Sequence, residues 1–179
     1  MAKLPAISPL DGRLLGEYPA ATADEIALKL QRARAAAGIW SQTPVRERCR
    51  ILVKFGELVL AEIDSIVDCL RLATGKVACE ALLGEIYPLL DLLAYYRKHA
   101  PDILADRSVA TSPFAFPGAT AGIRYRPVGV AAIISPWNYP FQLSVAPLLT
   151  ALFAGNAVIL KPSELSLPVG QLIVDLFQR

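Results

Sequence analysis

Residues 128–140, VGVAAIISPWNYP, decide the fold of this chain. The first seven are apolar or glycine and rich in β-branched side chains, and the run stops abruptly at Pro136-Trp137-Asn138. This pattern is typical of a buried parallel strand whose carboxyl end carries a functional loop. We therefore predict a buried strand over residues 128–134.

A second unit of the same kind occupies residues 157–164, AVILKPSE, where an apolar strand ends at Lys161 and Glu164. A helix is predicted between the two strands, over about residues 141–154, and another over about 167–177. The order strand, helix, strand, helix indicates an α/β fold with a parallel sheet. Ligands of such sheets bind outside the carboxyl ends of the strands.

The residues before this unit predict a hairpin and several helices. Asp11-Gly12 between short apolar segments indicates a hairpin over residues 5–19. A capping box at residues 22–25 starts a helix that reaches about residue 38. Further helices are expected from residue 43 onwards, over 62–73, ending at Thr74-Gly75, and over 79–99, where Pro88 should kink or split the last one.

Between these helices and the sheet, residues 101–121 are rich in Ser, Thr, Pro and Gly, which indicates an irregular or extended connector. Apolar and charged residues alternate over residues 123–126, which predicts a strand with one solvent-exposed face. We therefore divide the chain into an N-terminal hairpin and helices (1–105), an extended connector (106–127) and the strand–helix units (128–179).

Composition narrows the class of protein. The chain has 54% hydrophobic and 19% charged residues, a mean hydropathy of +0.43 and a net charge of +2. Either it is a membrane protein or a soluble chain that lacks surface to cover its core. The longest apolar stretch, 141–160, is broken by Pro147, Gly155 and Asn156, which favours the second explanation and argues against a membrane span. The scattered basic residues argue against a nucleic-acid partner.

Three cysteines, Cys49, Cys69 and Cys79, fall in predicted helices, and no pair has CxxC spacing. Their odd number and spacing predict neither a disulfide framework nor a metal site. We interpret each as a small buried hydrophobe of a protein from the reducing cytoplasm.

At residues 135–140, SPWNYP, and 155–164, GNAVILKPSE, the chain resembles the N-terminal portion of the aldehyde dehydrogenase superfamily. Thr74-Gly75-Lys76 and the early hairpin are similar to it as well. The resemblance implies a truncated aldehyde dehydrogenase fold, with the hairpin and helices packed on the first βαβα part of a Rossmann-like sheet. Members oxidise an aldehyde to a carboxylic acid with NAD or NADP, through thiolate attack, hydride transfer and thioester hydrolysis.

The resemblance also implies residue roles. Asn138 matches the catalytic amide that stabilises the oxyanion, since a neutral donor suits developing negative charge. Lys161 and Glu164 match contacts to the adenosine ribose. Glu164 would repel a 2′-phosphate, which slightly favours NAD over NADP, although Lys161 could offset this. The implied cofactor-binding residues are Ile134, Ser135, Pro136, Trp137, Asn138, Lys161, Ser163 and Glu164.

Simpler interpretations exist for the same side chains. Trp137 is then a core residue, and Asn138 a turn residue that tolerates a left-handed backbone. Lys161 is an exposed strand-end charge, and Glu164 an acid that the start of a helix favours. At the level of the whole chain, the alternative is a non-catalytic module that binds a dinucleotide or oligomerises with a full-length relative.

The chain departs from the family pattern at its end, Arg179, which comes before half of the usual family length. A Gly-rich pyrophosphate segment, the general-base Glu and the nucleophilic Cys are not found in it. We expect the polypeptide alone to be inactive, because thioester chemistry needs the thiol. We also expect self-association, through an open sheet edge or through residues 106–127 and the hairpin, which resemble the family's oligomerisation elements.

Overall fold

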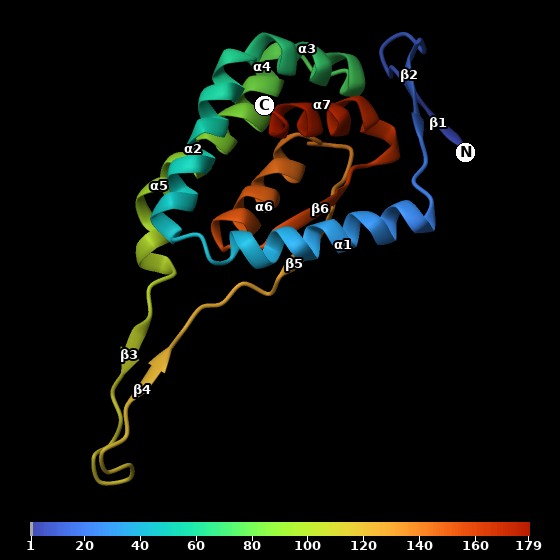
Figure 1. Cartoon of the computed structure of the whole chain (residues 1–179). Helices are drawn as coiled ribbons and strands as arrows, with labels where there is room; N and C mark the ends of the chain where they lie inside the picture. The colour runs from blue at the N-terminus through green and yellow to red at the C-terminus, as the bar shows by residue number, and fades with distance from the viewer. Residues whose placement is uncertain (1) are drawn as a thin grey trace.

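The structure, a computed structural model, describes residues 2–179. Its first element is the antiparallel hairpin of β1 (Lys3–Ile7) and β2 (Leu14–Pro19), which lies at one end of the molecule (Figure 1). Gly12 in the connecting turn has a φ of 72°, a backbone conformation that glycine adopts without strain. The hairpin predicted around Asp11-Gly12 is confirmed.

Three helices follow: α1 (Ala23–Trp40), α2 (Val45–Ala61) and α3 (Ile63–Thr74). The capping box predicted at residues 22–25 is present at the start of α1, with both reciprocal hydrogen bonds formed. Gly75 ends α3 in the left-handed conformation, with a φ of 79°, as the sequence predicts. Helix α1 is two residues longer than expected.

The helix expected around Pro88 is divided into three parts. A short α4 (Ala78–Ala81) leads into a π-helical turn (Leu82–Ile86), and α5 (Tyr87–Ile103) follows. Pro88 lies in the first turn of α5, where its missing N–H removes no bond that the new segment needs. The predicted split is confirmed, and the π turn is how the chain accommodates it.

A thin arm extends from the body between α5 and the parallel sheet (Figure 1). It contains β3 (Arg107–Val109) and β4 (Ala121–Ile123), which pair in antiparallel fashion. The connector is therefore extended, as predicted, but the strand expected over 123–126 ends at its first residue. No partner strand among the described residues faces residues 124–126, so nothing there sustains a ladder.

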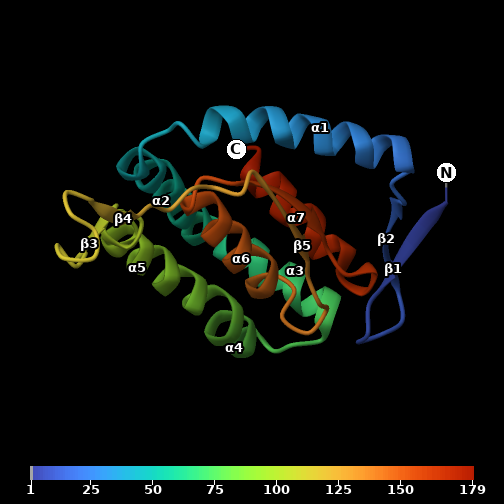
Figure 2. The same cartoon turned by 90° about the horizontal axis from the view of Figure 1, so that it is seen from below.

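The C-terminal part contains β5 (Val130–Ile134), α6 (Gln142–Phe153), β6 (Ala157–Lys161) and α7 (Leu167–Phe177), with a 3₁₀ turn at Glu164–Ser166 before α7. Strands β5 and β6 pair in parallel, so the predicted βαβα order is confirmed. Figure 2 shows α1 running along one side of these strands, and α6 and α7 on the other side.

The two parallel strands are less buried than predicted. Ala132 and Ile134 are exposed, whereas Ile133 packs against the core. The reason is that Ala132 and Ile134 point away from the core, to the face on which α1 packs mainly against β6 and leaves β5 partly uncovered. The prediction of a fully buried strand over 128–134 was wrong in this respect.

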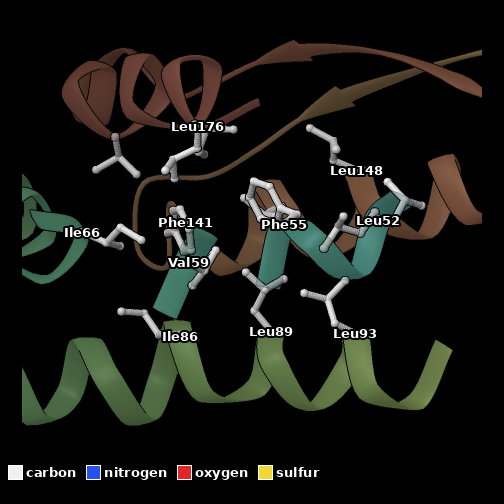
Figure 3. Close-up of a cluster of buried hydrophobic side chains, with 14 of the residues drawn as sticks. Leu52, Phe55, Val59, Ile66, Ile86, Leu89, Leu93, Phe141, Leu148 and Leu176 are labelled. Carbon is white, nitrogen blue, oxygen red and sulfur yellow. The ribbon is translucent and has the colours of Figure 1, made fainter. Parts of the chain in front are cut away.

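One hydrophobic core joins the N-terminal helices to the C-terminal unit (Figure 3). Helix α2 lies at its centre, between α5 on one side and α6 and α7 on the other. Within residues 2–179, no helix has the length and apolar character to cross a membrane. The labelled core residues are Leu52, Phe55, Val59, Ile66, Ile86, Leu89, Leu93, Phe141, Leu148 and Leu176.

Residues at the end of α6 fix where β5 begins. The Asn156 side chain accepts hydrogen bonds from the backbone N–H groups of Val128 and Gly129, at 2.8 and 3.1 Å. Gly155 has a φ of 93°, and a Cβ there would lie 2.8 Å from the Pro127 ring. The Gly-Asn pair therefore shapes the entry into β5 and the site beyond it.

Candidate functional site

The carboxyl ends of β5 and β6 meet at one edge of the sheet. Ile134 stands opposite Lys161 in the parallel register, and the Ser135 N–H donates to the Lys161 carbonyl at 3.2 Å. The loop that follows β5 and the turn that follows β6 therefore start side by side. This is the arrangement in which α/β sheets bind ligands.

The loop after β5 presents Pro136, Trp137 and Asn138 to solvent. Trp137 is 59% exposed, so the interpretation of it as a core residue was wrong. No residue other than glycine has a positive φ within residues 2–179, so Asn138 does not serve as a left-handed turn residue either. Its side-chain amide makes no hydrogen bond to the described residues, which leaves both N–H donors available.

Two of the predicted cofactor residues are buried. Ser135 Oγ lies 2.7 Å from Ser144 Oγ, and Ser144 donates to the Pro140 carbonyl at 2.5 Å. Ser163 Oγ accepts from the Leu165 N–H at 3.3 Å and caps the 3₁₀ turn. These hydroxyls hold the two loops in shape, and their contact with a cofactor stays a prediction.

Lys161 and Glu164 form an exposed ion pair at the end of β6. The ammonium donates to the carboxylate at 2.9 Å, and the two side chains are 60% and 62% exposed. The pKa of Glu164 lies below its ordinary value because its own backbone N–H and the Lys161 ammonium stabilise the anion. Glu164 also begins the 3₁₀ turn, so the simpler view of both residues as exposed charges agrees with their positions.

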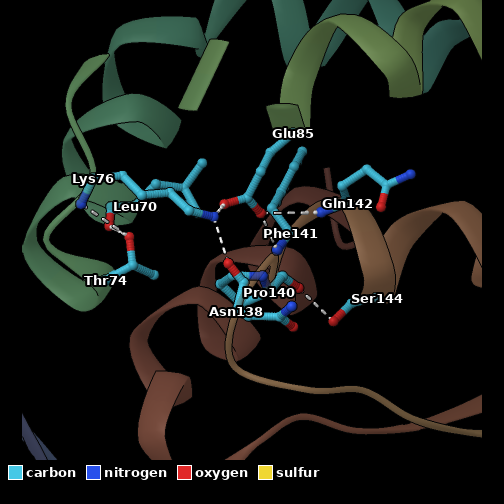
Figure 4. A network of polar contacts seen from close by, with 9 residues as sticks. All are labelled: Leu70, Thr74, Lys76, Glu85, Asn138, Pro140, Phe141, Gln142 and Ser144. Atoms are coloured by element: carbon cyan, nitrogen blue, oxygen red, sulfur yellow. Dashed lines mark hydrogen bonds and ion pairs between the residues drawn. The ribbon is translucent and has the colours of Figure 1, made fainter. Parts of the chain in front are cut away.

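The structure adds two residues to the candidate site that the sequence did not indicate. Lys76 donates to the Glu85 carboxylate at 2.6 Å and to the backbone carbonyl of Asn138 at 2.5 Å (Figure 4). Glu85 is fully buried, and its other oxygen accepts from the Phe141 and Gln142 N–H groups at 2.8 and 3.3 Å. This buried ion pair thus binds the backbone of the loop that carries Asn138, at Asn138 and at Phe141.

A sequence signal for Glu85 existed, because it stands as a lone acid in the apolar run ALLGEIYPLL of residues 81–90. An acid that is fully buried requires partners, and Phe141 and Gln142 offer the unpaired N–H groups of a helix start. For Lys76, the only signal in the sequence is the resemblance of Thr74-Gly75-Lys76 to the family. What the sequence could not supply is the contact between residues 62 positions apart.

The three thiols have different environments. Cys49 is buried, Cys69 is half-buried and Cys79 is exposed, so the expectation that all three are buried was wrong for Cys79. Cys79 lies in the first turn of the short α4, on a surface that no other element covers. Burial raises the pKa of the Cys69 thiol to about 11 and also raises that of Cys49. Within residues 2–179, no cluster of three or more His, Cys, Asp or Glu side chains could hold a metal ion.

Comparison with known proteins gives a consistent result along the whole chain. A model of the aldehyde dehydrogenase family matches residues 2–179. The 4,4'-diapolycopene aldehyde oxidase of Methylomonas sp is 63% identical over 177 residues, which is 99% of this chain and 33% of that protein. The chain thus spans about a third of the length of the curated relatives it matches.

Solved structures show the same fold. The aldehyde dehydrogenase from Brucella melitensis biovar abortus 2308 superposes with a TM-score of 0.91 at 24% identity, over 99% of this chain and 36% of that chain. PnpE in complex with nicotinamide adenine dinucleotide gives a TM-score of 0.89 at 25% identity, over 99% of this chain and 35% of its own. The matched part of these proteins is their N-terminal part.

Proposed function

Because the chain belongs to the aldehyde dehydrogenase family, we propose that residues 2–179 form the cofactor-side part of an NAD(P)-dependent enzyme that oxidises an aldehyde to a carboxylic acid. The observation that supports this most directly is the shared sheet edge. It brings the loop with Asn138 next to the turn with Lys161 and Glu164. A dinucleotide held at its ribose by Lys161 and Glu164 would have its nicotinamide end beside residues 134–138, where the oxyanion donor acts on the same carbonyl.

Asn138 is the proposed catalytic residue. Its amide is exposed, has no partner among the described residues and is neutral, so it can donate to the aldehyde oxygen as negative charge develops there. A preorganised donor of this kind typically contributes about 3–4 kcal/mol to transition-state stabilisation. The nucleophilic thiol is proposed to come from the part of the enzyme that this chain does not span. Cys49 and Cys69 are buried or half-buried with raised pKa values, and Cys79, although exposed, does not stand in the motif of the family's nucleophile.

Lys161 and Glu164 are proposed to hold the adenosine ribose, with the nicotinamide beside residues 134–138. The exposed carboxylate can accept from two ribose hydroxyls, and the ammonium has donors beyond its bond to Glu164. When bound, the dinucleotide supplies the hydride acceptor. The ionised Glu164 disfavours a 2′-phosphate, so NAD is proposed over NADP.

Residues 106–127 are proposed to mediate oligomerisation. The arm exposes large apolar side chains, and Phe114 at its tip is 98% exposed. Burial of such side chains against a second chain is favourable. This observation also supports the second candidate, a non-catalytic module that associates with a full-length relative. The three free thiols are typical of a reducing compartment, so we propose a cytoplasmic location.

A chimera tests the enzymatic proposal. Residues 1–179 replace the matching N-terminal third of the Methylomonas protein, and carboxylate formation is measured with NAD, with NADP and without either. We expect oxidation of 4,4'-diapolycopene aldehyde with one dinucleotide reduced per turnover, and a kcat about 10²–10³-fold lower for Asn138→Ala. Turnover that consumes oxygen and leaves the dinucleotide oxidised, or a folded chimera without activity, would contradict the proposal.

A further inference from the structure

We propose that Lys76 and Glu85 are positioning residues that hold the Asn138 amide in its working geometry. This rests on the proposed function of Asn138. Among the described residues the pair makes no hydrogen bond to β6 or its turn, and it binds the chain at two points, at Asn138 itself and at the start of α6 three residues later.

At the first point, Lys76 binds the backbone of Asn138 itself. The ammonium donates to the Asn138 carbonyl at 2.5 Å, and lies 3.8 Å from the centroid of the Tyr139 ring. Its remaining bond goes to Glu85 at 2.6 Å. The Lys76 side chain is 8% exposed, so water competes little for these contacts. The backbone of Asn138 is thereby fixed through its carbonyl group, while its side-chain amide stays free to bind a ligand.

At the second point, Glu85 binds the start of α6. One carboxylate oxygen accepts from the N–H groups of Phe141 and Gln142, which have no partner within the helix. A carboxylate at a helix N-terminus is also favoured by the helix dipole. The loop of residues 136–140 is thus tied at its end to the same pair that holds its middle (Figure 4).

Packing restricts the loop further. A Cβ at Gly84 would lie 2.9 Å from Tyr139 Cε1, so the absence of a side chain at Gly84 lets the tyrosine ring pack against the π-helical turn. The ring therefore packs against Gly84 and also contacts the Lys76 ammonium. Tyr139 is the neighbour of Asn138, and its immobilisation limits rotation of the peptide between them.

A buried ion pair is a weak source of net stability, because removing two charges from water costs about as much as their attraction returns. Its geometry, however, selects one arrangement of the groups around it. Here those groups are the Asn138 carbonyl and the first N–H groups of α6. The expected role is therefore conformational. A displacement of about 1 Å at such a donor can lower a rate by about 10²-fold.

A double-mutant cycle in the chimera tests this role. Lys76→Met, Asn138→Ala and the double variant are compared by kcat and by the KM for NAD. We expect Lys76→Met to lower kcat about 10–100-fold with the KM for NAD unchanged. In the Asn138→Ala background it should lower kcat by less than about threefold, because both changes remove the same interaction. Additive losses would overturn the inference.

The matched control is Arg71→Met, which breaks the exposed pair of Arg71 and Asp68, 3.3 Å apart in α3, and should leave kcat unchanged. If Asn138→Ala alone has no effect on kcat, the proposed role of Asn138 fails. If Asn138→Ala lowers kcat and Lys76→Met does not, only the positioning role fails.

A measurement on the 179-residue chain needs no activity. Amide hydrogen exchange is followed in Glu85→Gln at Phe141 and Gln142, with the Val145 N–H, which donates to the Phe141 carbonyl at 2.9 Å, as the internal reference. We expect exchange at Phe141 and Gln142 to speed up about tenfold or more relative to Val145. Equal acceleration at all three sites, or none, would overturn the inference. Should Glu85→Gln not fold, Gly84→Ala, which displaces Tyr139, takes its place with the same readout.

Discussion

The Ser135 N–H donates to the Lys161 carbonyl at 3.2 Å, and this bond is the last one of the parallel pair of β5 and β6. This bond aligns the carboxyl ends of β5 and β6 at the same edge of the sheet. The loop with Asn138 therefore leaves the sheet beside the turn with Glu164. A shift of the register by one residue would turn the side chains of one strand end to the opposite face and separate these groups.

Glu164→Gln should weaken NAD binding and reduce the proposed preference of the enzyme for NAD over NADP. The carboxylate is ionised throughout the neutral range, because its pKa is lowered by its own N–H and by Lys161. Its loss removes an anionic acceptor for the ribose and the repulsion of a 2′-phosphate. We expect the KM of the chimera for NAD to rise about tenfold while that for NADP falls or stays constant. Asp68→Asn, in another exposed i,i+3 pair, is the control, and equal changes for both cofactors would contradict this role.

Asn156→Ala should destabilise the fold, whereas Asn138→Ala should not. The Asn156 side chain satisfies two backbone N–H groups, at Val128 and Gly129, and its loss leaves them without an acceptor. We expect a decrease of about 1–3 kcal/mol in the free energy of unfolding, measured with urea. The exposed amide of Asn138 has no partner to lose, so its variant should stay within about 0.5 kcal/mol of the parent. The reverse order would show that the two asparagines have been assigned the wrong roles.

Thiol labelling of the folded chain at pH 8 should modify Cys79 first. Cys79 is exposed, whereas burial raises the pKa of Cys69 to about 11 and also raises that of Cys49. The reactive thiolate of Cys69 therefore forms only as the pH approaches 11. The free energy of unfolding should fall between pH 9 and 11, because the Cys69 thiol ionises near pH 9 in the unfolded chain and only near pH 11 in the folded one. Mass spectrometry identifies the labelled residue, and early labelling of Cys69 would contradict the structure.

Removal of the apolar tip of the arm should reduce self-association. Phe114 and Phe116 are 98% and 61% exposed, and their replacement by Ser removes the apolar surface that a second chain would bury. Sedimentation velocity of the 179-residue chain should then show a smaller mean mass. Leu60→Ser, at an equally apolar exposed position of α2, serves as the control. An unchanged mass for the double variant, or an equal decrease for Leu60→Ser, would contradict a specific role of the arm.

The parts of the fold that follow from local pattern were predictable from the sequence. The hairpin turn at Gly12, the cap at Gly75 and the division of the helix at Pro88 depend on the backbone limits of single residues. The alternation of strand and helix after residue 128 fixes the parallel pairing of β5 and β6. Burial of β5 was overestimated, because burial depends on neighbouring layers that a strand's own residues do not reveal.

The candidate site was predictable only for side chains that follow directly from a strand. Asn138, Lys161 and Glu164 were placed correctly at one edge, because parallel strands end on the same side. The Lys76–Glu85 pair could not be predicted, because its partners contact a loop far away in the chain. It also depends on the π-helical turn, which directs the Glu85 side chain toward the protein interior. The role of Ser163 as the cap of the 3₁₀ turn was also missed, because a serine at this position could equally cap a turn or contact a ligand.

The most direct test of the central claim is a crystal structure of the chimera with bound NAD. We predict that the adenosine ribose lies within hydrogen-bonding reach of the Glu164 carboxylate and that the nicotinamide lies beside residues 134–138. The Asn138 amide should face the space next to the nicotinamide ring, where the aldehyde oxygen would lie. A dinucleotide bound elsewhere, for instance in the apolar groove of about 820 Å³ between α1 and β6, would contradict it.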